Sequence, residues 1–164
     1  MINRMQADGV IERYAIGGAV GATFYLEPAA TLDVDVFVEF HIPPGSQIVS
    51  PEPIFKYLRD RGCKMEDEYV VIAGWPVRFL PAGSALLQEA LATALEKDVD
   101  GIPTHVFSAE HITAIALETG RAKDKARVLQ FIEAGVLDLE RLQEILARHG
   151  LIGDWQKFER QFLK

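Results

Sequence analysis

Residues 31–40 constrain the fold more than any other part of this chain, because they read Thr-Leu-Asp-Val-Asp-Val-Phe-Val-Glu-Phe. A period of two with many β-branched residues is typical of a strand with one buried face, so we predict a strand over about 32–41. Side chains alternate across a strand, and Thr31, Asp33 and Asp35 therefore share one face. The opposite face, directed at the core, carries Leu32, Val34, Val36 and Val38.

A glycine pair precedes this strand. Residues 13–16 predict a short strand that ends at Gly17 and Gly18, and the small and aromatic residues 19–26 indicate a short helix that begins there. Glycine at such a turn lets a phosphate approach backbone N–H groups at the positive end of the helix dipole. An ordinary tight turn is the alternative explanation for the pair.

Two carboxylates side by side on one strand face raise each other's pKa, so a cation between Asp33 and Asp35 is the simplest explanation for the pair. Oxygen ligands at fixed spacing suit Mg²⁺. A solvated polar face is the alternative. The order of apolar strand, Gly-Gly, short helix and Thr-x-Asp-x-Asp places a phosphate binder next to a metal pair, which suggests a nucleoside triphosphate as ligand.

The remaining pattern predicts an α/β half over residues 1–107 and a helical half over residues 108–164, packed on it as one compact unit. After a leading helix, the predicted elements are a loop over 41–53, a helix over 53–61, a hairpin over 68–73 and 76–80, an amphipathic helix from Ser84 to Leu95 and a β-rich piece over 105–107. From Ser108 onward, apolar residues recur every three to four positions, and glycines at 120, 135 and 150 separate the helices.

Composition narrows the class of protein. The 164 residues carry 24 acidic and 17 basic side chains, a net charge of −7, so the surface as a whole does not attract a nucleic-acid backbone, although a local basic patch can. No apolar run approaches the roughly 20 residues of a membrane-spanning helix. The single cysteine, Cys63, cannot form an internal disulfide. We therefore expect a cytoplasmic protein that makes no membrane contact.

Ile16-Gly17-Gly18-Ala19 and the strand that follows it resemble the signature of the DNA polymerase β-type nucleotidyltransferase superfamily. In particular, they are similar to the small prokaryotic proteins grouped with the AbiEii type toxins of toxin–antitoxin systems. The resemblance implies a nucleotidyltransferase-fold mixed sheet flanked by helices and followed by a helical bundle. It also implies that Gly17 and Gly18 contact the triphosphate and that Asp33 and Asp35 hold Mg²⁺. We add Thr31, on the same face, to the candidate nucleotide-binding residues.

Residues 120–127, Gly-Arg-Ala-Lys-Asp-Lys-Ala-Arg, resemble an Arg/Lys-Asp segment that follows the catalytic half in that group and lines the nucleotide or substrate side. Arg121, Lys123 and Arg127 at a helix start can clamp phosphate oxygens. Asp124 can orient one of these cations or cap the helix. A charged and solvated first turn is the alternative.

One position departs from the family pattern. The resemblance implies an acid at the centre of an apolar-acid-apolar triplet on a neighbouring strand, but Val77-Arg78-Phe79 places an arginine there. Residues 75–80 contain no acid, and we do not expect an acid of the preceding segment, residues 66–68, to reach the site. Arg78 can instead pair with Asp33 or Asp35, which would leave the site metal-poor, altered or inactive.

The sequence thus supports two hypotheses. The first is an Mg²⁺-dependent enzyme in which Asp33, Asp35 and Arg78 are the catalytic candidates, and which transfers a nucleoside monophosphate from a nucleoside triphosphate to an unknown protein or RNA acceptor. The second is a non-catalytic nucleotidyltransferase-fold protein that binds a nucleotide or a cognate partner protein in a toxin–antitoxin-like system. Arg78 is the main support for the second hypothesis.

Overall fold

The computed structural model describes residues 1–28, 30–31 and 33–164. Within these residues, seven strands form one mixed sheet: β1 Ile11–Ile16, β2 Val34–Phe40, β3 Lys64–Glu66, β4 Tyr69–Ile72, β5 Trp75–Pro81, β6 Leu95–Val99 and β7 Ile102–Val106. Their order across the sheet is β3-β4-β5-β2-β1-β7-β6.

Eight helices accompany the sheet in the same described residues. They are α1 Ile2–Ala7, α2 Gly18–Ala22, α3 Glu52–Arg59, α4 Ala85–Ala92, α5 Ala109–Thr119, α6 Ala122–Glu133, α7 Leu139–Arg148 and α8 Ile152–Phe162. The α/β (α+β) class predicted from the sequence is confirmed. None of the helices in the described part of the chain is long and apolar enough to cross a membrane.

β2 is the strand predicted with the period of two, and it lies near the middle of the sheet. It pairs antiparallel with β1 and parallel with β5. Val36 and Val38 are fully buried, as the alternation predicted, and Phe37 packs on the opposite face. Leu32, predicted on the core face, lies outside the described residues.

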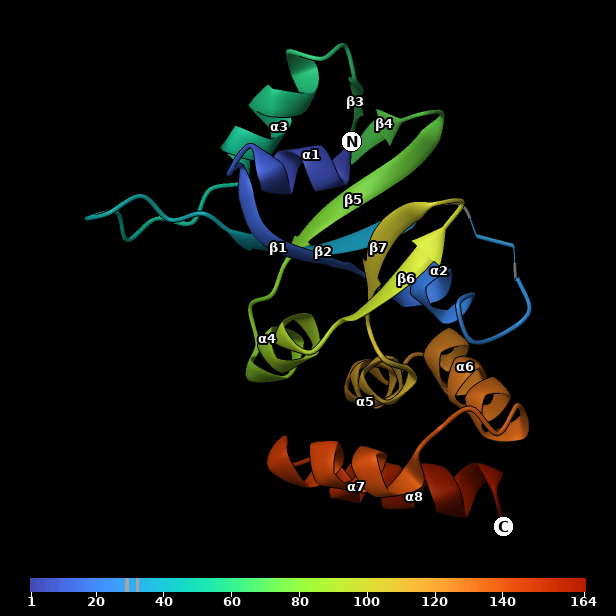
Figure 1. The fold of residues 1–164 in the computed structure, drawn as a ribbon. Helices are drawn as coiled ribbons and strands as arrows, with labels where there is room; N and C mark the ends of the chain where they lie inside the picture. Colours follow the sequence, from blue (N-terminus) through green and yellow to red (C-terminus); the bar gives the residue numbers. More distant parts are fainter. Residues whose placement is uncertain (29, 32) are drawn as a thin grey trace.

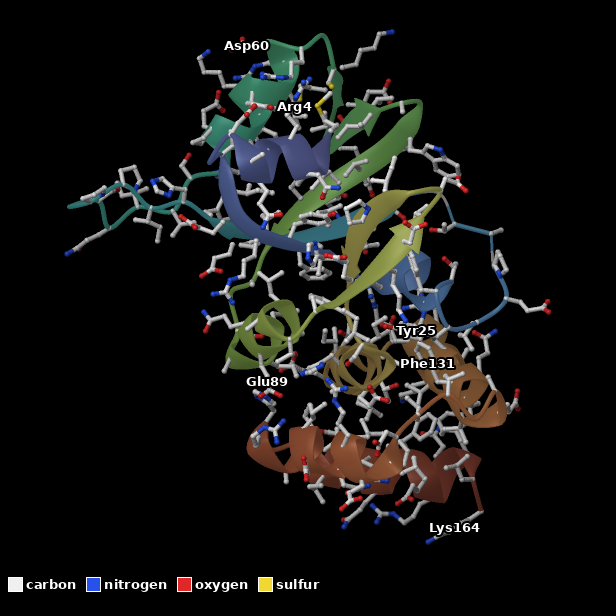
Figure 2. The ribbon with its side chains drawn as sticks, in the orientation of Figure 1. Arg4, Tyr25, Asp60, Glu89, Phe131 and Lys164 are labelled. Carbon is white, nitrogen blue, oxygen red and sulfur yellow. The ribbon has the colours of Figure 1, made fainter. Side chains whose placement is uncertain are left out.

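Helices cover both faces of the sheet (Figure 1). α1 and α3 cover the face that carries Val36 and Val38, and α2, α4 and α5 cover the other face. α7 and α8 pack against α5 on the side away from the sheet. Phe131 of α6 reaches the aromatic ring of Tyr25, just after α2, with ring centroids 6.2 Å apart (Figure 2). This contact joins the last turn of α6 to the chain after α2.

The predicted helices and the β4–β5 hairpin are present, with one correction and two additions. Ser84 begins α4, and its Oγ accepts a hydrogen bond from the N–H of Leu87 at 3.2 Å. The prediction that Leu95 belongs to this helix is wrong, because Leu95 begins β6 and pairs with Val106. β3 and β6 were not predicted. Helical spacing placed Leu95 on the apolar face of α4, but pairing with β7 overrides that spacing.

The helical half begins where the sheet ends. Ser108 follows β7 and caps α5, accepting a hydrogen bond from the N–H of His111 at 3.2 Å. The core of this half is built from apolar residues of α5 to α8, and Leu86 of α4 joins it. The division into halves at residue 107 stays a prediction, since α4, from the first half, packs into the helical core.

Candidate functional site

A cleft of about 470 Å³ lies beside the start of β2. Its lining comes from α2 and the chain after it, the start of β2, the middle of β5 and the first turns of α6. It brings together nine of the residues singled out in the sequence: Gly18, Thr31, Asp33, Asp35, Arg78, Arg121, Lys123, Asp124 and Arg127. Residues from four separate segments therefore meet at one place.

The two glycines have different surroundings. Gly18 lines the cleft with a φ of +57°, and a β-carbon there would lie 2.7 Å from Asp35 Oδ2. Glycine is therefore needed at position 18 both for its backbone conformation and for the close approach of the carboxylate. Gly17 lies behind the cleft, where its N–H donates to the Asp35 carbonyl at 3.0 Å and a β-carbon would meet the ring of Phe37 at 2.7 Å.

Asp33 and Asp35 both reach the cleft, with 30% and 21% of their side chains exposed. Thr31 lines the cleft beside them, and its hydroxyl donates to the Asp33 carbonyl oxygen at 3.1 Å. The strand begins later than predicted, at Val34, so only Asp35 of the three belongs to β2, and Thr31 and Asp33 reach the cleft from the chain that leads into it.

Arg78 lies directly opposite Asp35, because the parallel pairing of β2 and β5 sets these two residues side by side. Its Nε and Nη2 donate to one oxygen, Asp35 Oδ1, at 3.0 and 2.9 Å. Nη2 also lies 4.0 Å from Asp33 Oδ2. Partial burial lowers the pKa of Arg78, but the hydrogen bond and charge of Asp35 outweigh that effect and raise it above its ordinary value.

Two residues of the β3–β4 region complete this cluster. Glu68 was not expected to reach the site, yet its Oε1 lies 3.5 Å from Arg78 Nη1. Tyr69, which the sequence analysis missed, donates its hydroxyl to Asp33 Oδ2 at 3.3 Å. The β4–β5 hairpin places Tyr69 near Arg78, and only that three-dimensional pairing could have identified it. Arg78 thus contacts three carboxylates.

The start of α6 forms the opposite wall of the cleft. Asp124 is 2% exposed and accepts hydrogen bonds from Arg121 Nε at 2.6 Å and Arg121 Nη2 at 3.3 Å. Arg127 Nη1 lies 3.6 Å from the same carboxylate. Two roles were predicted for Asp124, orienting a cation and capping the helix. It contacts Arg121 and Arg127, and it does not cap α6, which begins without a side-chain cap. Lys123 is exposed and forms no ion pair with any described residue.

Charge is balanced in the cleft although the chain is acidic. Four acids, Glu27, Asp33, Asp35 and Asp124, face four bases, Arg78, Arg121, Lys123 and Arg127. The pKa of Arg121 is raised, first by its hydrogen bond to Asp124 and further by the charge of Asp35. Against a net charge of −7 for the chain, the α6 wall is a local basic surface that an anion can approach.

Binding of Mg²⁺ by Asp33 and Asp35 stays a prediction, and Arg78 bears directly on it. Among the residues that the structure describes, no group of three or more His, Cys, Asp or Glu side chains is arranged to hold a metal ion. A guanidinium occupies the place of the third acid and already compensates Asp35. Proteins commonly bind Mg²⁺ through one or two carboxylates, with waters and substrate phosphates completing the octahedron, so a site at Asp33 and Asp35 would need a bound nucleotide to be complete.

Comparison with known proteins supports the fold. No family model and no curated protein matches the sequence. An antigenic nucleotidyltransferase-like protein from Paracoccidioides brasiliensis is similar in structure, with a TM-score of 0.56 and 14% identity over 96% of this chain and 88% of that one. The antibiotic-resistance factor ANT(2'')-Ia is also similar, with a TM-score of 0.52 and 14% identity over 98% and 92% of the two chains.

These two likenesses show that the chain has a nucleotidyltransferase-like fold. At 14% identity they extend to the fold alone. They confirm the predicted nucleotidyltransferase fold. Membership of the superfamily and the finer resemblance to AbiEii-type proteins stay predictions.

Proposed function

We propose that the cleft binds the phosphate groups of a nucleoside triphosphate and that Arg78 replaces the metal-binding acid, so that the protein binds the nucleotide without transferring it. The observation that carries this proposal is the pairing of Arg78 with Asp35, at 2.9 and 3.0 Å, in the lining of the cleft.

The α6 wall supports the nucleotide part of the proposal. Lys123 is exposed and without an ion pair among the described residues, so its ammonium is available to a phosphate oxygen. Asp124 fixes Arg121 at the same wall. Gly18 leaves room opposite them because it has no side chain. A volume of about 470 Å³ lies within the range of small-molecule sites, roughly 300–1,000 Å³.

Arg78 supports the non-catalytic part. A guanidinium keeps its proton at any ordinary pH, so it serves neither as a general base nor as a metal ligand. Its bonds to Asp35 occupy one carboxylate oxygen, and its contacts with Asp33 and Glu68 supply the positive charge that a cation would otherwise bring. Binding is then independent of a divalent metal. The proposal keeps, as its other possible ligand, a cognate partner protein in a toxin–antitoxin-like system.

One observation favours transfer of a nucleoside monophosphate to a protein or RNA acceptor as a second candidate function. Arg78 donates only to Oδ1 of Asp35, and no described residue donates to Oδ2, which faces Gly18. An acidic oxygen thus remains available in the cleft beside the turn where triphosphate binding is proposed.

Nucleotide binding is tested by isothermal titration calorimetry with each of the four ribonucleoside triphosphates, once with EDTA and once with Mg²⁺. We expect binding that survives EDTA and weakens about tenfold in Lys123→Ala, the loss of one charged hydrogen bond. Lys125→Ala removes the same charge from the same helix outside the cleft lining and serves as the control. An equal loss in both variants, or no binding by the wild type, contradicts the proposal.

The second candidate is tested separately with α-labelled nucleoside triphosphates, Mg²⁺ and cell extract. Our proposal expects no labelled product from the wild type. Label transfer that disappears in the double variant Asp33→Ala, Asp35→Ala would establish the second candidate and refute the non-catalytic part of the first. Transfer that survives both substitutions would arise from a different group.

A further inference from the structure

We infer that the base of the bound nucleotide stacks on the ring of Tyr69, on the partly exposed face of the β4–β5 hairpin beside the cleft. This inference rests on the proposed function and deepens it, because it adds a site for the base to the site proposed for the phosphates. Stacking accepts every base, so the ligands are nucleoside triphosphates as a class and not one particular nucleotide.

The face of the sheet that carries Asp35 is packed under helices over only part of its width. α2, α4 and α5 form a core cluster on this face with residues of β1 and β2, and no described residue of β3, β4 or β5 belongs to that cluster. Val70 of β4 and Val77 of β5 are buried on the opposite face. Because side chains alternate along a strand, Tyr69 and Arg78 share the face of Asp35, and both are partly exposed there.

Strand pairing joins this open face to the cleft. Asp35 lies opposite Arg78 in the pairing of β2 with β5. The pairing of β4 with β5 sets Val70 opposite Val77, so one step further along the two strands Tyr69 lies beside Arg78. Neighbouring strands are about 4.8 Å apart, and the row from Asp35 to Tyr69 therefore spans roughly 10 Å, which one nucleotide can bridge. A ligand with its phosphates in the cleft thus reaches Tyr69 with its base.

The ring of Tyr69 is held in place by two contacts. Its hydroxyl donates to Asp33 Oδ2 at 3.3 Å, and the guanidinium carbon of Arg78 lies 5.8 Å from the ring centroid. A ring that is already fixed loses little conformational freedom when a base stacks on it. Val71 and Pro76 pair directly on the same face and are partly exposed, so they extend the apolar surface. An aromatic ring beside a guanidinium binds bases through their π-faces.

The cleft itself offers the base no stacking partner. None of the described residues that line it is aromatic. The end of α2, the chain after it and the later turns of α6 contribute small, aliphatic and polar residues to the lining: Ala22, Thr23, Leu26, Glu27, Ala126 and Gln130. A base placed there would be recognised by hydrogen bonds and not by stacking. Gln130 is therefore the residue to compare with Tyr69.

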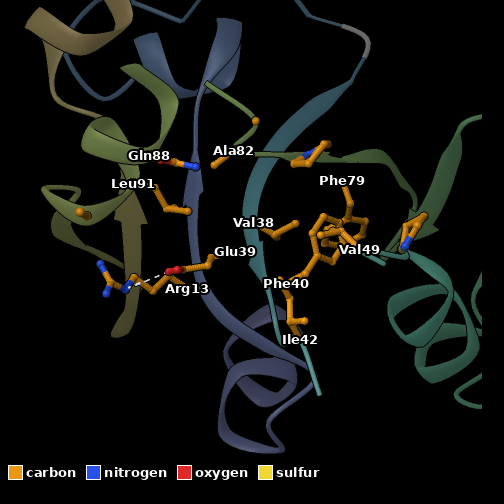
Figure 3. Close-up of a pocket in the computed structure, with 14 residues that line it drawn as sticks. Arg13, Val38, Glu39, Phe40, Ile42, Val49, Phe79, Ala82, Gln88 and Leu91 are labelled. Atoms are coloured by element: carbon orange, nitrogen blue, oxygen red, sulfur yellow. Dashed lines mark ion pairs between the residues drawn. The ribbon is translucent and has the colours of Figure 1, made fainter. Parts of the chain in front are cut away.

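The larger cavity of the molecule contains aromatic rings, but it lies apart from the cleft. It has a volume of about 810 Å³ and lies around Val38, Phe40 and Phe79, towards the end of β2 (Figure 3). No described residue lines both this cavity and the cleft. Phe79 follows Arg78 in β5 and so lies on the opposite face of the sheet. Tyr69 is thus the ring that a nucleotide held in the cleft can use.

Isothermal titration calorimetry in EDTA with two probes, a ribonucleoside triphosphate and inorganic tripolyphosphate, separates the site for the base from the site for the phosphates. We expect Tyr69→Ala to weaken nucleoside triphosphate binding about tenfold and to leave tripolyphosphate binding unchanged, because only base stacking is lost. Tyr69→Phe keeps the ring and should bind both probes as the wild type does. Lys123→Ala should weaken the binding of both probes. Unchanged tripolyphosphate binding also shows that a variant is folded.

Trp75→Ala is the matched control, because Trp75 is a 55% exposed aromatic residue of the same hairpin. Strand alternation places it with Val77 on the opposite face of the sheet, so its substitution should change neither affinity. A wild type that binds neither probe refutes the proposed function and the inference with it. If the wild type binds tripolyphosphate and Tyr69→Ala binds the nucleotide as tightly as the wild type does, the inference alone is overturned. A loss confined to Gln130→Ala would place the base at the α6 end.

The range of bases is tested in the same titrations. Adenosine, guanosine, cytidine and uridine triphosphates should bind the wild type within about tenfold of one another, because every base has a π-face. Tyr69→Ala should weaken the binding of all four. A larger preference for one base would show recognition by hydrogen bonds and overturn stacking as the means of recognition.

Discussion

Asp35 in the cleft and Glu89 of α4 are two carboxylates with nearly equal exposure. They differ in how many of their oxygens accept hydrogen bonds from side chains. Their side chains are 21% and 23% exposed. Both oxygens of Glu89 are occupied: Arg148 lies at 2.7 and 3.3 Å, His111 at 3.1 Å and His149 at 2.7 Å. Asp35 uses one oxygen and leaves the other open to the cleft. A carboxylate that joins helices therefore differs from one available to a ligand in that hydrogen bonds occupy both of its oxygens. The exposure of the two side chains does not distinguish them.

The partners of Glu89 come from α5 and from the end of α7, so this single side chain links α4 to the helical half (Figure 2). The hydrogen bond from Arg148 is the largest influence on its pKa, and with those from His149 and His111 it outweighs burial and lowers the pKa to about 2. Glu89 is therefore ionised across the physiological range and acts as a fixed anion between α4, α5 and α7.

The largest effect on stability is expected from a substitution of Glu89. Glu89→Gln places an amide donor against side chains that already donate, and we expect the free energy of unfolding to fall by about 2 kcal/mol. Asp35→Asn, which disturbs hydrogen bonds from Arg78 alone, should cost less than about 1 kcal/mol. Denaturant unfolding measures both changes.

Glu144→Gln is the control for this first prediction, because Glu144 is 65% exposed and lies 4.0 Å from Arg148. Its effect should stay within about 0.5 kcal/mol. An Asp35→Asn loss as large as that of Glu89→Gln would show that the cleft carboxylate also holds the fold, and the distinction between the two sites would fail.

The next largest effect is expected on metal affinity, from a substitution of Arg78. Arg78→Asp removes the cation and adds a third carboxylate beside Asp33 and Asp35, since position 78 lies directly opposite Asp35. We expect affinity for Mn²⁺, a paramagnetic substitute for Mg²⁺, to rise at least about tenfold over the wild type, because oxygen ligands and negative charge both increase. Electron paramagnetic resonance of free Mn²⁺ measures it.

Arg78→Ala separates the two causes of that rise, because it removes the cation without adding a ligand. It should give a smaller increase than Arg78→Asp. If neither variant binds Mn²⁺ more tightly than the wild type does, the guanidinium is not what keeps the site from holding a metal.

The sequence could predict the cleft wherever the signal is local. The period of two over residues 31–40 placed Asp33 and Asp35 on one face, the glycine turn placed Gly18 beside them, and the charged first turn of α6 supplied another wall. Each of these patterns lies within about ten residues. The resemblance to a known superfamily then joined them into one site, and the cleft contains them together.

Other features depend on register and could not be predicted. The Arg78–Asp35 pair joins residues 43 positions apart, and only the parallel pairing of β2 with β5 sets them opposite each other. Glu68 was excluded because no sequence pattern shows how the hairpin turns it toward Arg78. Glu89 was missed for the same reason: its partners lie 22, 59 and 60 residues away.

The smallest expected effect is the acid dependence of stability, and it arises at Glu89 and its neighbour His111. Burial lowers the pKa of His111 and outweighs the hydrogen bond and charge of Glu89, so the folded state binds fewer protons than the unfolded state just below the ordinary histidine pKa of about 6.5. This contribution to stability is complete above about pH 6.5 and declines as the pH falls. Glu89 adds a second decline in stability below about pH 4.5 that runs toward its folded pKa of about 2.

Thermal unfolding between pH 7.5 and about pH 5 should thus show a gradual loss of stability in the wild type. The loss should be smaller than the effect of Glu89→Gln, and His111→Gln should flatten it. Stability that rises on acidification through this range would reverse the sign and show that His111 is held protonated, as a cation paired with Glu89.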